Sequence, residues 1–348
     1  MSIMTVLGEI EREALGITLP HEHFFVDLRW ACKEPIDPVE NVLFHSLVGM
    51  ENVGRLRRNP YIVSDNSLLD DLDLTTKEVL EFKKAGGRTI IEVSSIGVGR
   101  SPSGIRSVSS LTGINVVMGS GYYTKYALSE EIVTTPESEL TRQLIEELQY
   151  GIGATGIRPG VIGEVGITPN VGEWDEKTLR IAAEGHRESG LPIYIHIQAV
   201  PLVPGFTGNP NGIEVLRILE SLKVDLEKVV ICHCDAQSKP EYQLEVAKAG
   251  AYVEFDHFGK EFYVETSDFL LDRDYDRIDA MQVLVEAGYS DQLLMSQDIC
   301  LKSDLVSFGG WGYAHILTNI VPILRTRGWD FETIKKIMVD NPGRLLNV

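Results

Sequence analysis

Two histidines separated by one residue, His21 and His23, are the first side chains in the chain whose spacing suits metal chemistry. Side chains alternate along a strand, so on an extended segment both imidazoles face one side and Glu22 faces the other. Imidazole is a common ligand of Zn²⁺ and related divalent cations. Taken alone, however, the pair favours two hydrogen-bonded histidines over a metal site.

Four further side chains of ligand type stand at the ends of short apolar runs. His196 lies near the end of PIYIHI, His233 ends KVVICH, Glu164 lies in VIGEVG and Asp298 closes LLMSQD. A carboxylate in so apolar a run is costly to bury unless a cation or hydrogen bonds compensate it. Backbone N–H groups of the following segments are the alternative partners of the two carboxylates. Together with the first pair, these positions favour a site for two metal ions.

The apolar runs alternate with helical segments, which indicates repeated βα units around a parallel sheet. Helical segments such as DEKTLRIAAEGHRESG end in glycine shortly before the next apolar run, at 86–87, 190, 250 and 288. Eight strands are expected near residues 16–24, 88–95, 114–120, 160–166, 192–198, 228–234, 251–257 and 292–298.

Eight such alternations favour a closed (β/α)₈ TIM barrel, and we expect residues 1–348 to form a single domain. An open doubly wound sheet is the alternative, but GVGRSPSG at 97–104 is no dinucleotide-binding fingerprint. Active sites of (β/α)₈ barrels lie at the C-terminal ends of the strands. Long segments at 28–74, 258–276 and 299–330 are expected to cover that mouth.

Composition excludes some classes of partner. Acidic residues outnumber basic ones by 51 to 32, giving a net charge of −19, which disfavours nucleic acid and anionic membranes. The first residues lack the features of a signal peptide, and no apolar run approaches the ~18 residues of a membrane span, so we expect a cytoplasmic protein. Cys32, Cys232, Cys234 and Cys300 show no CxxC spacing and are expected to be core residues.

Over nearly its whole length the chain resembles the phosphotriesterase-like family of the amidohydrolase superfamily. The resemblance rests on HEH at 21–23, GEVG around Glu164, His196, HCD from His233, SQD ending at Asp298 and the closing DNPGRLL. It implies two divalent metal ions, usually zinc, with Mn²⁺ or Co²⁺ as alternatives. By this likeness His21, His23 and Asp298 hold the more buried ion, His196 and His233 hold the more exposed ion, and Glu164 bridges both.

Two departures from the family pattern matter. Many members bridge the metals with a carboxylated lysine, whereas this chain has Glu164, which makes efficient organophosphate hydrolysis less expected. The best-known phosphotriesterases place an acidic residue of a proton relay where this chain has Ala236, after Asp235. If a relay through His257 exists here, the sequence leaves its next member open.

The chemistry that these residues imply is hydrolysis. Two cations sharing a water lower its pKa enough to supply hydroxide near neutral pH, and Asp298 is the expected proton acceptor. Tyr122 and Tyr123 resemble the family's mouth tyrosine, and packing under a loop is the alternative for both. Lys260 and Arg273 could bind a phosphate or carboxylate, whereas we expect Arg277 to lie on a solvated helix face.

The sequence thus predicts a metal-dependent hydrolase acting on a lactone or another carboxylic ester. Alternatives are a phosphorylated sugar lactone hydrolase, a phosphotriester hydrolase as a side activity, and a barrel that only binds a metal-chelating metabolite. The expected partner is a small-molecule substrate, with neither nucleic acid nor membrane, and the family likeness suggests a homodimer.

Overall fold

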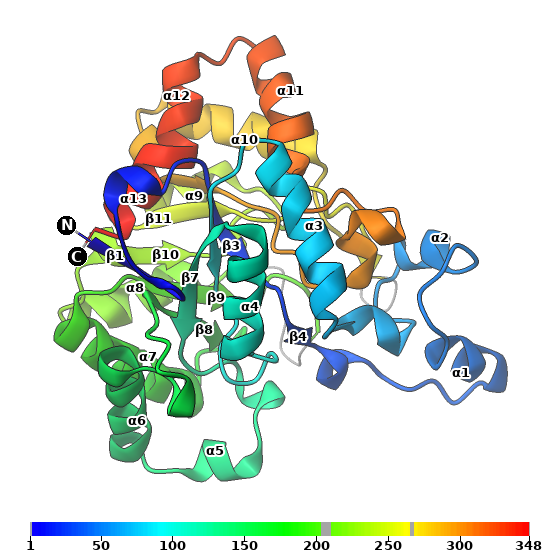
Figure 1. Cartoon of the computed structure of the whole chain (residues 1–348), viewed down its shortest axis with the longest axis horizontal. Helices are drawn as coiled ribbons and strands as arrows, with labels where there is room; N and C mark the ends of the chain where they lie inside the picture. The colour runs from blue at the N-terminus through cyan, green and yellow to red at the C-terminus, as the bar shows by residue number, and fades with distance from the viewer. Residues whose placement is uncertain (1, 203–209, 265–267, 348) are drawn as a thin grey trace.

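Eight parallel strands form a barrel in the computed structural model, which describes residues 2–202, 210–264 and 268–347. Helices surround the barrel (Figure 1). All eight expected strands are present; seven are shorter than predicted, and the fourth has the predicted length but lies one residue later. They are β3 (Thr18–Glu22), β6 (Thr89–Glu92), β7 (Asn115–Ser120), β8 (Val161–Ile167), β9 (Ile193–Ile197), β10 (Val229–Ile231), β11 (Tyr252–Phe255) and β14 (Leu293–Met295).

The strands pair with their neighbours in chain order, from β3 through to β14, and every pairing is parallel. Hydrogen bonds between the segment after β14 and β3 close the barrel. The backbone N–H of Asp298 donates to the carbonyl of His21 at 3.2 Å, and that of His21 donates to Ser296 Oγ at 3.1 Å. The predicted (β/α)₈ barrel is therefore confirmed.

Helices follow the strands where the sequence shows helical periodicity. Asp71 caps the first long one by accepting a hydrogen bond from the N–H of Leu74. Gly190 ends another in a left-handed conformation that glycine adopts without strain. The helices are α1 (Pro38–Phe44), α2 (Val53–Leu56), α3 (Leu72–Lys84), α4 (Pro102–Thr112), α5 (Glu130–Thr134), α6 (Glu137–Tyr150), α7 (Glu173–Ser189), α8 (Gly212–Ser221), α9 (Pro240–Lys248), α10 (Asp274–Glu286), α11 (Val321–Thr326), α12 (Phe331–Lys335) and α13 (Asn341–Leu345).

An N-terminal hairpin, β1 (Ser2–Thr5) with β2 (Gly8–Glu11), was not expected from the sequence. Its residue Ile3 packs with Leu15, Leu345 and Leu346 against the side chains that fill the barrel interior. Both chain ends lie at this side of the molecule (Figure 1). The hairpin and the C-terminal helix α13 thus seal the end of the barrel opposite the strands' C-terminal mouth.

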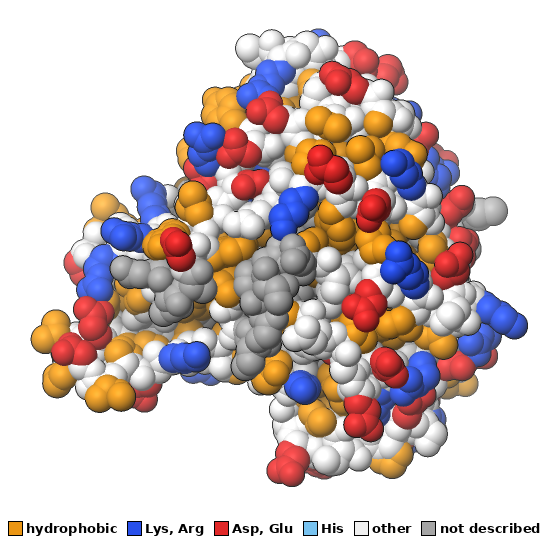
Figure 2. Space-filling view, turned by 180° about the vertical axis from the view of Figure 1, so that it is seen from behind, with side chains coloured by type: hydrophobic (Ala, Val, Ile, Leu, Met, Phe, Trp, Pro, Cys, Tyr) orange, Lys and Arg blue, Asp and Glu red, His pale blue; other side chains and the backbone are white. Residues whose placement is uncertain are grey.

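The long segments were predicted with mixed accuracy. Residues 28–74 do reach the mouth, and their helices α1 and α2 extend away from the barrel (Figure 1). Exposed apolar side chains gather on this lobe (Figure 2), among them Ile36, Val39, Val42 and Met50. The prediction of one mouth loop over 299–330 is partly wrong, because residues 316–326 are helical and pack Ile316, Ile320 and Leu324 into the core.

No helix in the described part of the chain is both long and apolar enough to cross a membrane.

Candidate metal centre

Six buried side chains meet at the C-terminal end of the barrel. They come from five strands that lie far apart in the sequence, and none of these residues is more than 8% exposed. His21 lies in β3 and His23 directly follows it, Glu164 lies in β8, His196 lies in β9, His233 follows β10 and Asp298 follows β14.

One half of the group consists of His21, His23 and Asp298. Asp298 Oδ1 lies 3.2 Å from His23 Nε2 and 3.8 Å from His21 Nε2, which is itself 3.8 Å from Glu164 Oε1. Burial lowers the pKa of His21 to about 4, so the ring is neutral. Its Nε2 is buried and has no hydrogen-bond partner. A buried nitrogen without a partner, aimed at two carboxylates, fits a divalent cation between these atoms.

The other half contains His196 and His233. Glu164 Oε1 lies 2.7 Å from His196 Nδ1 and 3.2 Å from His233 Nε2, and these two nitrogens are 2.7 Å apart. Glu164 Oε2 lies 3.7 Å from His23 Nε2, so the glutamate faces both halves. Donor atoms of His21, His23 and Asp298 lie within 4.8 Å of one another, and so do those of His21, Glu164 and His233, so each group could hold one cation.

Backbone turns, rather than strand alternation, aim two of these side chains. His233 and Asp298 both have positive φ values, 61° and 49°. Strand alternation would place Cys232 and Cys234 on the same side, and the turn at His233 prevents it. Because the chain leaves β10 before His233, Cys232 packs inside the barrel, whereas Cys234 packs in the core outside it.

A cavity of about 660 Å³, its open mouth included, is lined by five of the six side chains, all except His21. Tyr123 lines it, with its hydroxyl 3.0 Å from His196 Nε2. Burial raises the pKa of Tyr123 well above its ordinary value, so the phenol keeps its proton and can donate a hydrogen bond. Much of the remaining wall is apolar and is formed by Val26, Leu28, Trp30, Tyr61, Val98, Ala199, Val200, Leu202, Phe262 and Leu301.

Asp298 also contacts two polar side chains outside the group of six. Lys260 Nζ donates to its Oδ2 at 2.6 Å, and His257 Nε2 lies 3.6 Å from the same oxygen. Burial works to raise the pKa of Asp298, but Lys260 and His23 outweigh it and hold that pKa well below its ordinary value. The carboxylate is therefore ionised, as a metal ligand must be.

Behind His257 lies Asp235. Its Oδ1 is 3.2 Å from His257 Nδ1, without the alignment of a hydrogen bond, and its Oδ2 accepts from the His257 backbone N–H at 2.9 Å. Arg277 Nε donates to the same Oδ2 at 3.0 Å. The expectation that Arg277 lies on a solvated face is wrong, because its side chain is fully buried and also contacts Asp274. The sequence pattern of α10 did not reveal this burial.

Two predicted substrate contacts lie away from the cavity. Tyr122 is buried in the core between the barrel and the helices, and its hydroxyl donates to the carbonyl of Leu140 at 3.1 Å. Arg273 is exposed at the start of α10 and pairs with Asp276 at 2.9 Å. Neither side chain lines the cavity, and Tyr122 has a packing role, although it packs against helix α6 rather than under a loop.

Other residues of the site were not singled out from the sequence. Trp30, Tyr61 and Phe262 reach the cavity from segments without periodic signals. Glu254 and Asp256, by contrast, could have been predicted. They are separated by one residue in EFDH at the end of the seventh barrel strand, so alternation places both side chains on the face towards the barrel interior.

A (β/α)₈ barrel with clustered histidines and carboxylates at the C-terminal mouth defines a class of metal-dependent hydrolases. The sequence profile of the phosphotriesterase family matches residues 1–346. The chain belongs to the phosphotriesterase family.

Individual relatives cover almost the whole chain. An N-acetyltaurine hydrolase from Danio rerio is 34% identical over 349 residues, spanning 99% of this chain and 97% of the relative. The crystal structure of a resiniferatoxin-binding protein from Rhodobacter sphaeroides superposes with a TM-score of 0.93 at 34% identity and covers 99% of this chain and 95% of that one. A lactonase from Listeria monocytogenes superposes with a TM-score of 0.77 at 26% identity, covering 100% and 99%.

Proposed function

We propose that this chain hydrolyses a carboxylic acyl bond of a small molecule with the help of two divalent cations, of which Zn²⁺ is the first to test. The observation that carries the proposal is the convergence of four histidines and two carboxylates below an open cavity, with His21 Nε2 buried and unpartnered. His21, His23 and Asp298 would hold one ion, His196 and His233 the other, and Glu164 would contact both. Mn²⁺ and Co²⁺ suit the same ligands.

When bound, two such cations supply hydroxide near neutral pH and polarise the bond to be cleaved. The protein then has to move a proton, and Asp298 is placed to accept it. Its Oδ1 faces the histidines, whereas its Oδ2 faces Lys260 and His257. His257 is the next group that could take the proton towards Asp235. Tyr123 could orient the substrate by donating a hydrogen bond from its hydroxyl group.

The cavity also limits the substrate. Among its described lining residues, Lys260 is the one that carries a permanent positive charge, and much of the wall is apolar. This arrangement favours a small substrate with an acidic group near the scissile bond and an apolar part. The relative from Danio rerio is named for an amide substrate that carries a sulfonate, and the similar structure from Listeria is a lactonase. We therefore place an acidic N-acyl amide beside the lactones and other carboxylic esters.

The test is a hydrolysis screen of the zinc-loaded chain against N-acetyltaurine, an uncharged lactone, a phosphorylated sugar lactone and a phosphotriester. Turnover of an amide or a lactone supports the proposal and separates the two acyl classes. Turnover of the phosphotriester alone contradicts the acyl assignment. The matched control is Asp298→Asn, in which turnover should be lost, with the metal content measured on the same sample.

A binding protein without turnover is the second candidate, because the similar structure with the TM-score of 0.93 is that of a resiniferatoxin-binding protein. Under this alternative the metal-loaded chain binds a metabolite but cleaves no compound of the panel. Calorimetry on the same compounds distinguishes binding without hydrolysis from the absence of both.

A further inference from the structure

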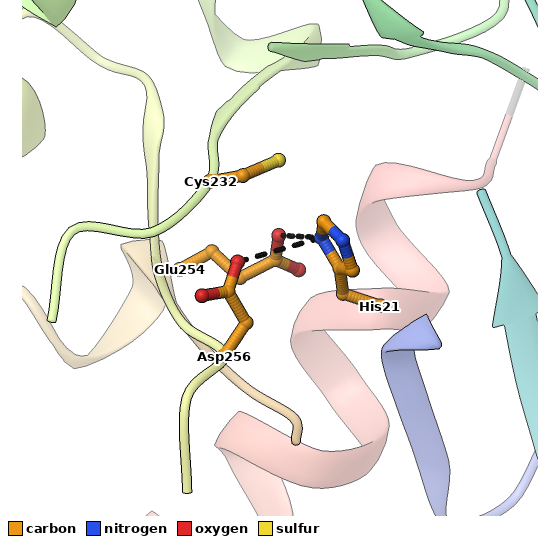
Figure 3. A group of neighbouring side chains, drawn as sticks. All are labelled: His21, Cys232, Glu254 and Asp256. Carbon is orange, nitrogen blue, oxygen red and sulfur yellow. Dashed lines mark hydrogen bonds and ion pairs between the residues drawn. The ribbon is translucent and has the colours of Figure 1, made fainter. Parts of the chain in front are cut away.

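Two buried carboxylates lie beneath the candidate metal centre, one in the strand β11 and one directly after it. Glu254 and Asp256 are separated by one residue and both project into the barrel, where His21 and Cys232 complete the group (Figure 3). All four side chains are fully buried. Carboxylates are seldom buried without partners that compensate their charge, so their contacts with the site above them need an explanation.

Asp256 contacts histidines from both halves of the centre. Its Oδ1 accepts a hydrogen bond from His233 Nδ1 at 3.0 Å, and its Oδ2 accepts from the backbone N–H of His233 at 2.9 Å. The same Oδ2 lies 3.4 Å from His21 Nδ1. Asp256 therefore holds both the ring of His233 and the left-handed backbone that aims it, and it also reaches His21.

Glu254 contacts only one of the two histidines. Its Oε2 accepts from His21 Nδ1 at 2.9 Å (Figure 3). With Nδ1 of each ring bound from below, the Nε2 atoms of His21 and His233 are directed towards Glu164, at 3.8 Å and 3.2 Å. A carboxylate that accepts from the distal ring nitrogen fixes the tautomer and increases the basicity of the ligating nitrogen.

We propose that Asp256 is a positioning residue shared by both metal positions, whereas Glu254 supports only the position that contains His21. The inference rests on the binuclear centre proposed above and adds a coupling between its halves. Removing Asp256 should weaken both ions, because it frees His233 and loosens His21. Removing Glu254 should weaken one ion and leave the other.

The same four side chains could instead hold a third cation, since their donor atoms lie within 4.8 Å of one another. Hydrogen bonding is the better explanation, because three of the four carboxylate oxygens already lie within 3.4 Å of a His21 or His233 nitrogen. The two explanations differ in the number of ions bound and in the importance of Cys232, whose thiol would be a ligand only of a third ion.

The experiment measures zinc stoichiometry and affinity by competition with a chromophoric chelator, together with the Co²⁺ absorption spectrum. It compares the wild-type chain with Asp256→Asn, Glu254→Leu, Glu254→Gln and Cys232→Ser. We expect Asp256→Asn to weaken both ions, because its single amide oxygen cannot accept from both His233 donors. We expect Glu254→Leu to weaken one ion by about 10- to 100-fold. Glu254→Gln should restore most of that loss, since its amide oxygen can still accept from His21. Cys232→Ser should change neither ion.

Unchanged affinities and an unchanged Co²⁺ spectrum in folded Asp256→Asn and Glu254→Leu variants would overturn the inference. Three ions in the wild-type chain, with the third lost in Cys232→Ser, would also overturn it. If Asp256→Asn does not fold by circular dichroism, the comparison of Glu254→Leu with Glu254→Gln decides. A wild-type chain that binds two ions but hydrolyses nothing contradicts the proposed function alone, whereas fewer than two ions contradicts both proposals.

Discussion

At the scale of single residues, the charge of each buried group is set by its contacts. Asp298 stays ionised in a buried position because Lys260 and His23 face it. Lys260 stays charged for the reciprocal reason, since burial lowers its pKa but Asp298 raises that pKa well above its ordinary value. The two charges therefore depend on each other, so replacing either residue also perturbs the pKa of the other.

Replacing Asp298 by Asn should lower kcat by about 10²- to 10⁴-fold, the usual contribution of a positioned proton acceptor. The amide can still offer an oxygen to a metal but cannot take a proton at neutral pH. Steady-state kinetics, with zinc measured on the same preparation, check this outcome. A variant that keeps both its zinc and more than half of the wild-type kcat would remove Asp298 from the mechanism.

Lys260→Met should raise KM for acidic substrates by about 10-fold or more, because a charge-assisted hydrogen bond contributes roughly 1.5–3 kcal/mol. Uncharged lactones should be affected much less, since they offer no anion to the ammonium group. The comparison of KM for one acidic and one uncharged substrate decides. Equal effects on the KM of both substrates would indicate that Lys260 acts through Asp298 rather than by binding the substrate.

At the scale of elements, α10 joins the site to the outer ring of helices. Its two nearby arginines have opposite environments. Arg277 is fully buried between Asp235 and Asp274, whereas the side chain of Arg273 is 68% exposed beside Asp276. The same helix therefore supplies a test residue and its matched control.

Arg277→Met should destabilise the chain by about 3–5 kcal/mol, because it leaves Asp235 as an uncompensated buried charge. Arg273→Met should cost at most about 1 kcal/mol, since an exposed ion pair contributes little. Urea unfolding of both variants measures the two free energies. Comparable losses in the two variants would contradict the burial of Arg277.

At the scale of the whole molecule, barrel closure depends on contacts between residues 275 positions apart. Ser296 Oγ accepts from the backbone N–H of His21 at 3.1 Å and lies 2.8 Å from both the His21 carbonyl and Glu22 Oε1. One hydroxyl thus joins the end of the eighth barrel strand to the first strand and holds the segment that carries two candidate ligands.

Ser296→Ala should lower the free energy of unfolding by about 1–3 kcal/mol, because it removes the acceptor of the buried backbone N–H of His21. The exposed Ser138 provides the control, and its replacement by Ala should change stability by less than about 0.5 kcal/mol. Thermal or urea unfolding measures both. If the two variants unfold alike, the hydroxyl does not hold the barrel closed.

Metal removal should lower the melting temperature of the entire barrel, since its candidate ligands come from five strands. A ligand that binds only the folded state adds about 2.7 kcal/mol when its free concentration is 100 times its Kd. Calorimetry before and after chelation, followed by zinc addition, checks this effect. A melting temperature independent of zinc would contradict metal binding by the folded chain.

The sequence by itself determined the eight strands, the helices between them and the six residues at the strand ends. Periodic hydrophobicity and strand-end position are local signals, so a barrel and the convergence of His21, Glu164 and Asp298 could be predicted without coordinates. The N-terminal hairpin was not predicted because its short strands carry little periodic signal.

Only the tertiary structure decided which side chains face the cavity and which charges are buried together. Tyr122 and Tyr123 are neighbours in sequence, yet one packs in the core and the other reaches His196. Arg277 and Asp235 lie 42 positions apart, and no local pattern reveals that they pair. Such placements depend on packing between elements and on backbone turns such as the one at His233. These turns interrupt the alternation of side chains from which the facing of strand residues is predicted.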